Sequence, residues 1–301
     1  MKTFIKVAEI WVPTKEGTQL ELASGIYGTL TDFKEASEQT RFDYHQGLPG
    51  TAWAAAHPLV TTEFMHSCFN RSQAAKKAGL NCAIALPVFS GEFLMAVIVF
   101  LCGDDELHAG AIEVWANHPD RDNELGVIDG YYGSLDYFEF ISKKTKIMKS
   151  FGLPGQVWEK GLPVLMADLG ESQSFIRGRD AKNAGITTAL GIPWSDRAGQ
   201  VYIMTFLSAK ATPIARQLEI WLPDAKRQRL VFRDGFSKKA TDLAAVYGAK
   251  TFAKGEGIIG RVWLTGVPAI VDDYGVEESM ATLLMPVINQ GELTAVIVFC
   301  L

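Results

Sequence analysis

The sequence has few cysteines, no long apolar run and no large basic cluster, and each absence excludes a class of protein. Four cysteines in 301 residues show neither a C-x-x-C spacing nor the dense pattern of a disulfide-rich secreted domain. No stretch approaches the roughly 18 to 20 consecutive apolar residues of a membrane-spanning helix. The N-terminus lacks the features of a secretion signal. We therefore expect a soluble, cytoplasmic protein with no membrane partner.

The charges of the chain do not favour binding to nucleic acid. The formal net charge is −5, with 29 basic and 34 acidic residues interspersed along the chain. Neutralising phosphates requires clustered Lys and Arg, whereas the richest basic stretches, 143–146 and 226–229, are short. We interpret both stretches as solvated faces and expect no nucleic-acid partner.

What the sequence does contain is one stretch that occurs three times at a constant interval of 105 residues. The copies read GLPGTAW, GLPGQVW and GIIGRVW, and they begin at Gly47, Gly152 and Gly257. A proline and then an acidic residue follow every copy at the same spacing. These acids are Glu63, Asp168 and Asp273. A fixed period of this kind indicates one module that is repeated.

The period divides the chain into three expected domains, 1–105, 106–210 and 211–301. The third is shortened, because 30 residues separate Pro163 from Pro193 but only 18 separate Pro268 from Pro286. The connections between repeats are too short for a long linker helix, so we expect the modules to contact each other closely. The chain stops within an apolar run, so a segment of a longer protein is one expectation.

Each repeat opens with a predicted β-hairpin. Its first strand carries Glu, one apolar residue and Trp, and residues two apart in a strand share a face. The glutamate and the tryptophan therefore point the same way. The pairs are Glu9 with Trp11, Glu113 with Trp115, and Glu219 with Trp221.

A helix and two apolar strands are predicted after the glycine-proline element. Helices are expected over 69–79 and 175–185, because Ala and Lys favour helix and a glycine ends each segment; the third repeat lacks this piece. The closing strands are rich in β-branched residues, which is typical of the buried centre of a sheet. A recurring proline in the first of them predicts a strand end or edge, since proline cannot donate to a ladder. These prolines are Pro87, Pro193 and Pro286.

This order of elements resembles the GAF domain, a small α/β sensor fold related to PAS domains. The resemblance covers nearly the whole chain, with two nearly complete copies and a shortened third. It implies an α/β (α+β) fold of tandem modules, each an antiparallel six-stranded sheet with short helices on one face. It places a ligand pocket between the other face and the segment from the glycine-proline element to the short helix. The long flanking helices of the family are missing, so helix-mediated dimerisation is not expected.

Three ligand classes of such domains lack their signatures here. The Asn-Lys, Phe, Asp-Glu series of cyclic-nucleotide-binding members is absent from every repeat. Bilin-binding members attach the chromophore through a Cys beside a His, and Cys68, two residues after His66, stands in a different context. All five histidines fall within the first 118 residues without the tight spacing of a metal motif. The cofactor is therefore unknown, with no cyclic nucleotide, bilin or metal expected.

The resemblance also includes an enzyme, the free methionine-R-sulfoxide reductase, which uses redox cysteines in a Gly-x-Cys-Gly loop and the loop after it. Here Pro49 stands where that cysteine would be, and Cys68 and Cys82 do not fall at the other positions. No Walker loop, H-E-x-x-H or G-x-S-x-G motif supports another chemistry. We expect a protein that is not an enzyme.

Arg71 and Arg177, at equivalent places in the first two repeats, are the best polar candidates for a pocket. Each could bind a carboxylate or phosphate bidentately. The alternative is a structural ion pair that holds loop to helix, with Glu63 for Arg71 and Asp168 for Arg177. We expect the tryptophans of the first strands to pack the sheet. The candidate ligand-binding residues are Trp53, Glu63, Phe69, Arg71, Trp158, Asp168, Phe175 and Arg177.

The sequence thus predicts a non-enzymatic sensory or regulatory protein of signal transduction, with a small-molecule pocket in the first two repeats. A ligand-free protein-interaction scaffold is the alternative, and the sulfoxide reductase is a weaker one. A downstream signalling protein or a second copy of the chain is the partner that such a role implies.

Overall fold

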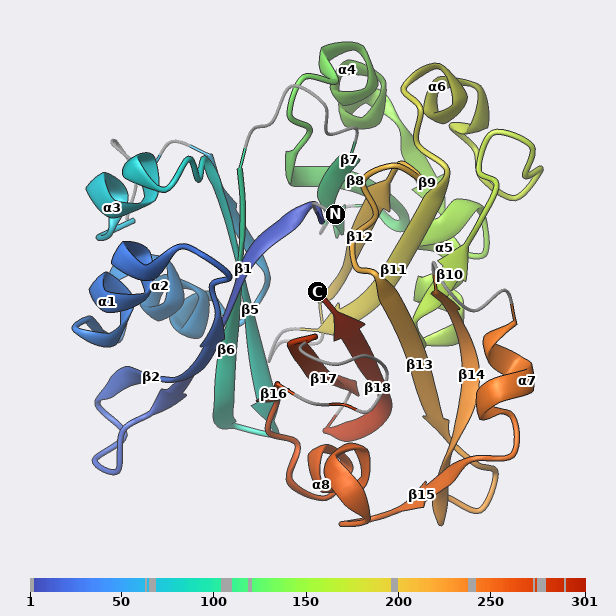
Figure 1. Cartoon of the computed structure of the whole chain (residues 1–301). Coiled ribbons are helices and arrows are strands. Elements are labelled where there is room, and N and C mark those ends of the chain that lie inside the picture. Colours follow the sequence, from blue (N-terminus) through green and yellow to red (C-terminus); the bar gives the residue numbers. More distant parts are fainter. Residues whose placement is uncertain are drawn as a thin grey trace.

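The strands form three six-stranded sheets in which all pairs of neighbours are antiparallel (Figure 1). The computed structural model describes residues 3–62, 64, 69–103, 110–118, 121–195, 200–237, 242–272, 274, 280–289 and 291–301. The sheets draw their strands from 5–102, 110–208 and 217–300, one from each copy of the repeat. The predicted α+β fold of tandem modules is confirmed.

The modules share one order of elements: a hairpin, a helix, a short strand, a second helix, an edge strand and two long closing strands. Module 1 has β1 (Ile5–Pro13), β2 (Gln19–Ile26), α1 (Thr31–Glu38), β3 (Arg41–Asp43), α2 (Gly47–Ala55), β4 (Leu59–Thr61), α3 (Ser72–Lys77), β5 (Cys82–Ser90) and β6 (Phe93–Cys102). Module 2 has β7 (Gly110–His118), β8 (Arg121–Tyr131), α4 (Asp136–Lys144), β9 (Lys146–Met148), α5 (Gly152–Lys160), β10 (Val164–Met166), α6 (Gly178–Asn183), β11 (Thr188–Ser195) and β12 (Val201–Ser208). Module 3 has β13 (Gln217–Pro223), β14 (Arg229–Ser237), α7 (Leu243–Tyr247), β15 (Thr251–Ala253), α8 (Gly257–Thr265), β16 (Ala269–Val271), β17 (Thr282–Asn289) and β18 (Glu292–Cys300).

The first and the last strand of each module are neighbours at the centre of its sheet. The order is β3-β2-β1-β6-β5-β4 in module 1, and modules 2 and 3 repeat it with their own strands. The predicted opening hairpins and paired closing strands are therefore confirmed. None of the helices in the described part of the chain is long and apolar enough to cross a membrane.

The recurring glycine-proline element is a nine-residue helix in every module. Its first glycine has a positive φ, which glycine adopts readily. These φ values are 62°, 57° and 59° at Gly47, Gly152 and Gly257. A Cβ on the second glycine, Gly50, would clash with the carbonyl oxygen of Asp43, and the other two copies meet the same obstacle. The two glycines of the G-x-x-G spacing therefore allow the helix to begin close beside the preceding strand.

The third helix of modules 1 and 2 is shorter than the sequence predicted. α3 and α6 span six residues each and begin after Arg71 and Arg177. The predicted terminal glycines are confirmed, because Gly79 and Gly185 have φ of 66° and 71°. Each helix begins later than predicted because the arginine before it has a non-helical backbone, with φ near −100°, and a buried side chain.

One face of each sheet is buried under the helices of its own module. In module 1 this core joins Trp11 of the sheet to Phe33 of α1, Leu48 of α2 and Ala75 of α3. The equivalent cores of modules 2 and 3 contain Trp115 and Trp221. All three tryptophans have no exposed surface, which confirms the prediction that they pack the sheet.

The other faces of the three sheets meet in one shared core. Phe100 of β6, Phe206 of β12 and Phe299 of β18 meet there, with ring centroids 5.8, 5.8 and 6.3 Å apart. Strands lie toward the middle of the molecule and helices toward the outside (Figure 1). The predicted close contact between modules is confirmed. Burial of both faces explains why the closing strands are continuously apolar.

This arrangement corrects the expected position of a pocket. The resemblance to the GAF domain implied a pocket between the glycine-proline segment and the face without helices. The glycine-proline helix α2 instead packs on the same face as α1 and α3, and the opposite face is buried in the shared core. Packing between modules, which the fold of one module does not determine, occupies that second face.

The recurring prolines lie inside β5, β11 and β17, not at their ends. The short edge strands pair only as far as Ala85, Gly191 and Leu284. Each proline follows two residues later, where its strand has no partner on that side within the described residues. Each proline therefore lies at a locally unpaired edge of its strand and not at the strand end. Because no partner strand is paired there, the N–H that proline lacks removes no hydrogen bond of the ladder.

Candidate functional site

A buried glutamate lies at the centre of each helix-side core. Glu9, Glu113 and Glu219, from the recurring Glu-x-Trp motif, are all 0% exposed. Each carboxylate accepts a hydrogen bond from the indole N–H two residues later, at 3.0, 2.9 and 2.8 Å respectively. The predicted common face of the glutamate and the tryptophan is confirmed. A buried carboxylate requires compensation by a cation or by hydrogen bonds.

In module 1 Arg71 compensates Glu9. Its Nη1 and Nη2 donate to the two carboxylate oxygens at 2.6 and 2.8 Å, which is a bidentate ion pair. The hydroxyls of Tyr27 and Ser37 donate to Oε1 at 2.9 and 2.7 Å. The guanidinium also lies 5.1 Å from the Trp11 ring and 4.9 Å from the Phe33 ring. Charge, hydrogen bonds and π faces together compensate the buried carboxylate, while the buried Arg71 Nε has no hydrogen-bond partner among the described residues.

Module 2 repeats the same centre. Arg177 donates to both oxygens of Glu113, at 2.5 and 2.9 Å. Thr205 and Tyr132 donate to the carboxylate at 2.9 and 3.2 Å. The guanidinium lies 5.4 Å from the ring of Phe175.

Module 3 keeps the glutamate, but within the described residues no arginine pairs with it. Gln217 donates to Oε1 of Glu219 at 2.6 Å, and the Tyr274 hydroxyl donates to Oε2 at 3.0 Å. Tyr247 lies beside them and accepts a hydrogen bond from Gln217 at 3.1 Å. Neutral donors therefore surround this carboxylate, and two tyrosines occupy the space next to it.

Opposing effects act on the pKa of the two paired glutamates. Burial alone would raise the pKa of Glu9, but the charge and hydrogen bonds of Arg71, with those of Ser37 and Trp11, outweigh burial and lower it. The pKa of Glu113 is lowered in the same way by Arg177, Thr205 and Ser142. Burial and the adjacent carboxylate raise the pKa of Tyr27, so its hydroxyl stays protonated and can donate.

These shifts predict an acid-sensitive fold. A lowered folded-state pKa contributes stability that is present above the ordinary glutamate pKa of 4.5 and is lost as pH falls through the folded value. We expect the free energy of unfolding to decline progressively below pH 4.5, as measured by urea titration at several pH values. A Glu9→Leu/Arg71→Met variant should show a shallower decline, and an unchanged slope would contradict the assignment to Glu9.

The structure brings together only some of the predicted site residues. Phe69 and Arg71 meet in module 1, as Phe175 and Arg177 do in module 2. Trp53 is half-buried on α2, 5.1 Å from the ring of Tyr44. Trp158 is half-buried on α5, and neither tryptophan belongs to the Glu–Arg centres.

The predicted acidic partner of Arg177 is wrong. Asp168 is exposed, whereas Arg177 is 3% exposed and binds Glu113. Arg71 likewise binds Glu9; its predicted partner Glu63 lies outside the described residues, as does Asp273. The Glu-x-Trp motif could have identified the partner of the arginine, because a glutamate on the same strand face as a core tryptophan must be buried. In the first two repeats, the recurring arginine supplies the cation that compensates this buried carboxylate.

The described cysteines are poor nucleophiles. Cys82, Cys102 and Cys300 are buried. Burial raises the pKa of the Cys82 and Cys102 thiols, which disfavours the reactive thiolate. Cys68 lies outside the described residues. Among the residues that the structure describes, no three His, Cys, Asp or Glu side chains gather as a metal site.

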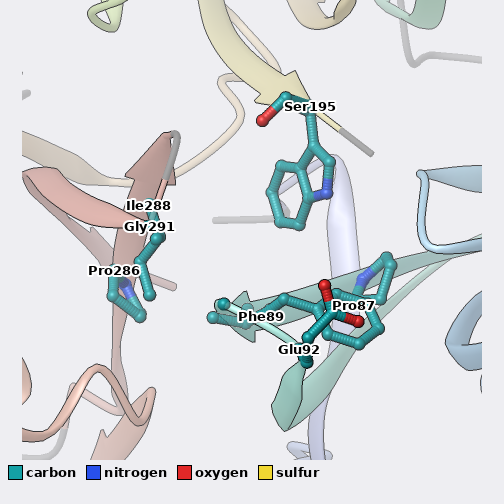
Figure 2. Close-up of a pocket in the computed structure, with 10 residues that line it drawn as sticks. Pro87, Phe89, Glu92, Ser195, Pro286, Ile288 and Gly291 are labelled. Atoms are coloured by element: carbon teal, nitrogen blue, oxygen red, sulfur yellow. The ribbon is translucent and has the colours of Figure 1, made fainter. Parts of the chain in front are cut away.

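Two cavities lie where modules meet. One of about 190 Å³ is formed by the strand and hairpin ends of all three modules, with Pro87, Phe89 and Glu92 facing Ser195 and Pro286 (Figure 2). The other, of about 240 Å³, lies between modules 1 and 2 and is lined in part by His57 and Tyr202.

The sheet order, the helices on one face and the central buried tryptophan are common to all three modules. The modules are GAF-like.

Comparisons with solved structures find GAF domains that each align with about a third of this chain. The NLH2 GAF domain of A. Aeolicus is 22% identical over 34% of this chain and 59% of its own, with a TM-score of 0.27. Free methionine-R-sulfoxide reductase from Neisseria meningitidis, in complex with its substrate, is 20% identical over 34% of this chain and 57% of its own, with a TM-score of 0.26. NreA of Staphylococcus aureus, mutated in its nitrate-binding site, is 18% identical over 36% of this chain and 80% of its own, with a TM-score of 0.28.

The chain spans less than three fifths of the length of the first two GAF chains it matches, with 59% and 58% covered. No family model matches the chain, and no curated protein matches it in sequence.

Proposed function

We propose that this chain is a non-enzymatic sensory or regulatory protein of signal transduction that binds a small molecule through its GAF-like modules. The observation that carries the proposal is the shared core. Because Phe100, Phe206 and Phe299 pack together, a ligand that changes the packing of one module acts on the other two. Such coupling suits regulation, and GAF-like folds are often sensory or regulatory domains.

The absence of catalytic chemistry is part of the proposal. Supporting it, the buried thiols of Cys82 and Cys102 have raised pKa values, and Pro49 stands where a GAF-type reductase would need a cysteine. We propose the cytoplasm as the location, because its reducing conditions keep cysteine thiols free.

The arginines are assigned a structural role within this function. Both Nη atoms of Arg71 and Arg177 already donate to buried carboxylates. A ligand carboxylate would have to displace Glu9 or Glu113 and leave it buried without a cation. We therefore place ligand binding at the cavities between modules rather than on the guanidinium groups.

Native mass spectrometry of the purified chain, followed by thermal-shift screening with a metabolite library, tests this function. We expect a co-purified or added small molecule that raises the melting temperature and binds one per chain. The binding should persist when all four cysteines are replaced by alanine in a variant that still folds. Catalytic turnover of free methionine-R-sulfoxide that the cysteine-free variant lacks would overturn the non-enzymatic assignment.

A ligand-free interaction scaffold is the second candidate, and one surface favours it. Module 2 exposes apolar side chains at positions where module 1 has polar ones. The exposed residues are Tyr137, Phe140, Met148, Phe151 and Ile176, against Asp32, Glu35, Asp43, Gln46 and Asn70. Failure of every small molecule to bind would leave the scaffold as the better account.

A further inference from the structure

The cavity between modules 1 and 2 lies at a junction that the two modules build together. His57 of module 1 stacks on Tyr202 of β12, with ring centroids 4.6 Å apart and planes 12° from parallel. Nearby, the Val60 N–H of β4 donates to Asp129 Oδ2 of β8 at 3.1 Å. The remaining wall comes from β7, β8, β9 and β12 of module 2. A molecule bound in this cavity would contact both modules.

Module 1 shows what the same strand positions look like when they are filled. On β2 and β3, Gln19 stands opposite Asp43 and Glu21 opposite Arg41. The first pair makes a hydrogen bond of 2.8 Å and the second an ion pair of 3.0 Å. β2, one strand of this pair, contacts β16 of module 3.

Module 2 has lost both cross-strand pairs in the same register. Glu124 stands opposite Met148, and Gly126 stands opposite Lys146. Glu124, Gly126 and Lys146 all line the cavity. Within the described residues, neither Glu124 nor Lys146 has a side-chain hydrogen bond or ion pair. The junction therefore holds a carboxylate and an ammonium whose module 1 counterparts are paired.

Glycine at 126 is not required by the backbone. Its φ is not positive, so other residues could adopt its conformation. A Cβ there would meet the Nζ atom of Lys146, which lies over the glycine. The missing side chain both opens the space and removes the acid that pairs with the cation in module 1.

We propose that this junction binds a small zwitterion of the free α-amino acid class, an inference that rests on the proposed sensory function and names its ligand. The Lys146 ammonium would pair with the ligand carboxylate, and Glu124 would accept from the ligand ammonium. Ala116 and Tyr202 offer an apolar wall for the side chain. The cavity is smaller than the roughly 300–1,000 Å³ of pockets for drug-sized ligands, which matches a ligand of this size.

Bound between the modules, the amino acid would act as a clamp. It would contact His57 from module 1 and the charged strands of module 2, and so stabilise the junction by mass action. The same contacts would bias the packing of the shared core behind β8 and β12.

Isothermal titration with L-alanine, L-valine, L-leucine and L-phenylalanine tests the proposal. We expect at least one to bind one per chain. Isopentylamine and 4-methylpentanoate, which lack the carboxylate or the amine of leucine, should bind about 10- to 100-fold more weakly, as expected for loss of a charged hydrogen bond. Gly126→Glu, which restores the module 1 arrangement, should abolish binding. Lys146→Met should weaken it about 10- to 100-fold.

Glu21→Gly at the equivalent position of module 1 is the matched control and should leave the affinity unchanged. Circular dichroism establishes that each variant folds, and Lys146→Met keeps the test decisive if Gly126→Glu does not fold. Amino acid binding that survives Lys146→Met, or binding of no amino acid by the wild type, overturns the junction site. If other metabolites still raise the melting temperature, the sensory function survives that result; if none does, both proposals fail.

Discussion

Arg71→Met is expected to lower the free energy of unfolding by about 3–5 kcal/mol, the range for removing one partner of a buried ion pair. Glu9 would remain with no exposed surface and no cation. The Tyr27, Ser37 and Trp11 hydrogen bonds would remain, but the attraction of the guanidinium charge would be lost. Urea unfolding monitored by tryptophan fluorescence measures the change, and Arg177→Met in module 2 should behave alike.

The double variant Glu9→Leu/Arg71→Met separates lost attraction from an uncompensated charge. Replacing a buried pair by apolar residues of similar volume is often neutral or stabilising, so it should recover most of the loss. Module 3 shows that the fold tolerates a centre without arginine. An Arg71→Met protein with wild-type stability but no ligand binding would instead assign Arg71 to a pocket.

Phe206→Ala is expected to cost about 3–5 kcal/mol, the usual range for deleting a buried aromatic ring. Phe206 belongs to the shared core, where its ring contacts Phe100 of module 1 and Phe299 of module 3. The loss should therefore weaken all three modules together. Differential scanning calorimetry should show one transition at a lower temperature rather than a separate early transition of module 2.

Phe140→Ala on α4 is the control in the same module. Its side chain is 52% exposed, so we expect a change within about 0.5 kcal/mol. Three resolved transitions in the wild type, with only one shifted by Phe206→Ala, would show that the modules unfold independently. Such a result would also remove the basis for coupling between them.

Local chemistry made much of the architecture predictable. The period in glycine, tryptophan and proline predicted three copies of one module, because each copy needs a left-handed glycine and a close approach at the same places. Gly47 and Gly50 illustrate both requirements. Apolar, β-branched closing strands predicted the sheet centre, and Gly79 predicted the end of α3. These features depend on neighbours in the chain, so one sequence was sufficient.

The candidate site was predictable only in part, because its partners are distant in sequence. Arg71 was singled out, but Glu9 lies 62 residues away on another element. An acid near the arginine in sequence was the simpler partner to choose, and for Arg177 that choice of Asp168 was wrong. Strand alternation already placed Glu9 and Glu113 beside core tryptophans, and the electrostatics of burial then required a cation.

The sequence by itself determined the repeat, the opening hairpins, the paired closing strands and the inward-facing tryptophans of each module. The first helix of each module and the helical form of the glycine-proline element came only from the structure. Only the tertiary structure decided how the three sheets face one another. The apolar residues of a strand indicate that its face is buried, but they do not identify the surface that packs on it, because the hydrophobic effect is non-directional. The shared core and the junction cavity opened by Gly126 therefore became visible only when the modules were assembled.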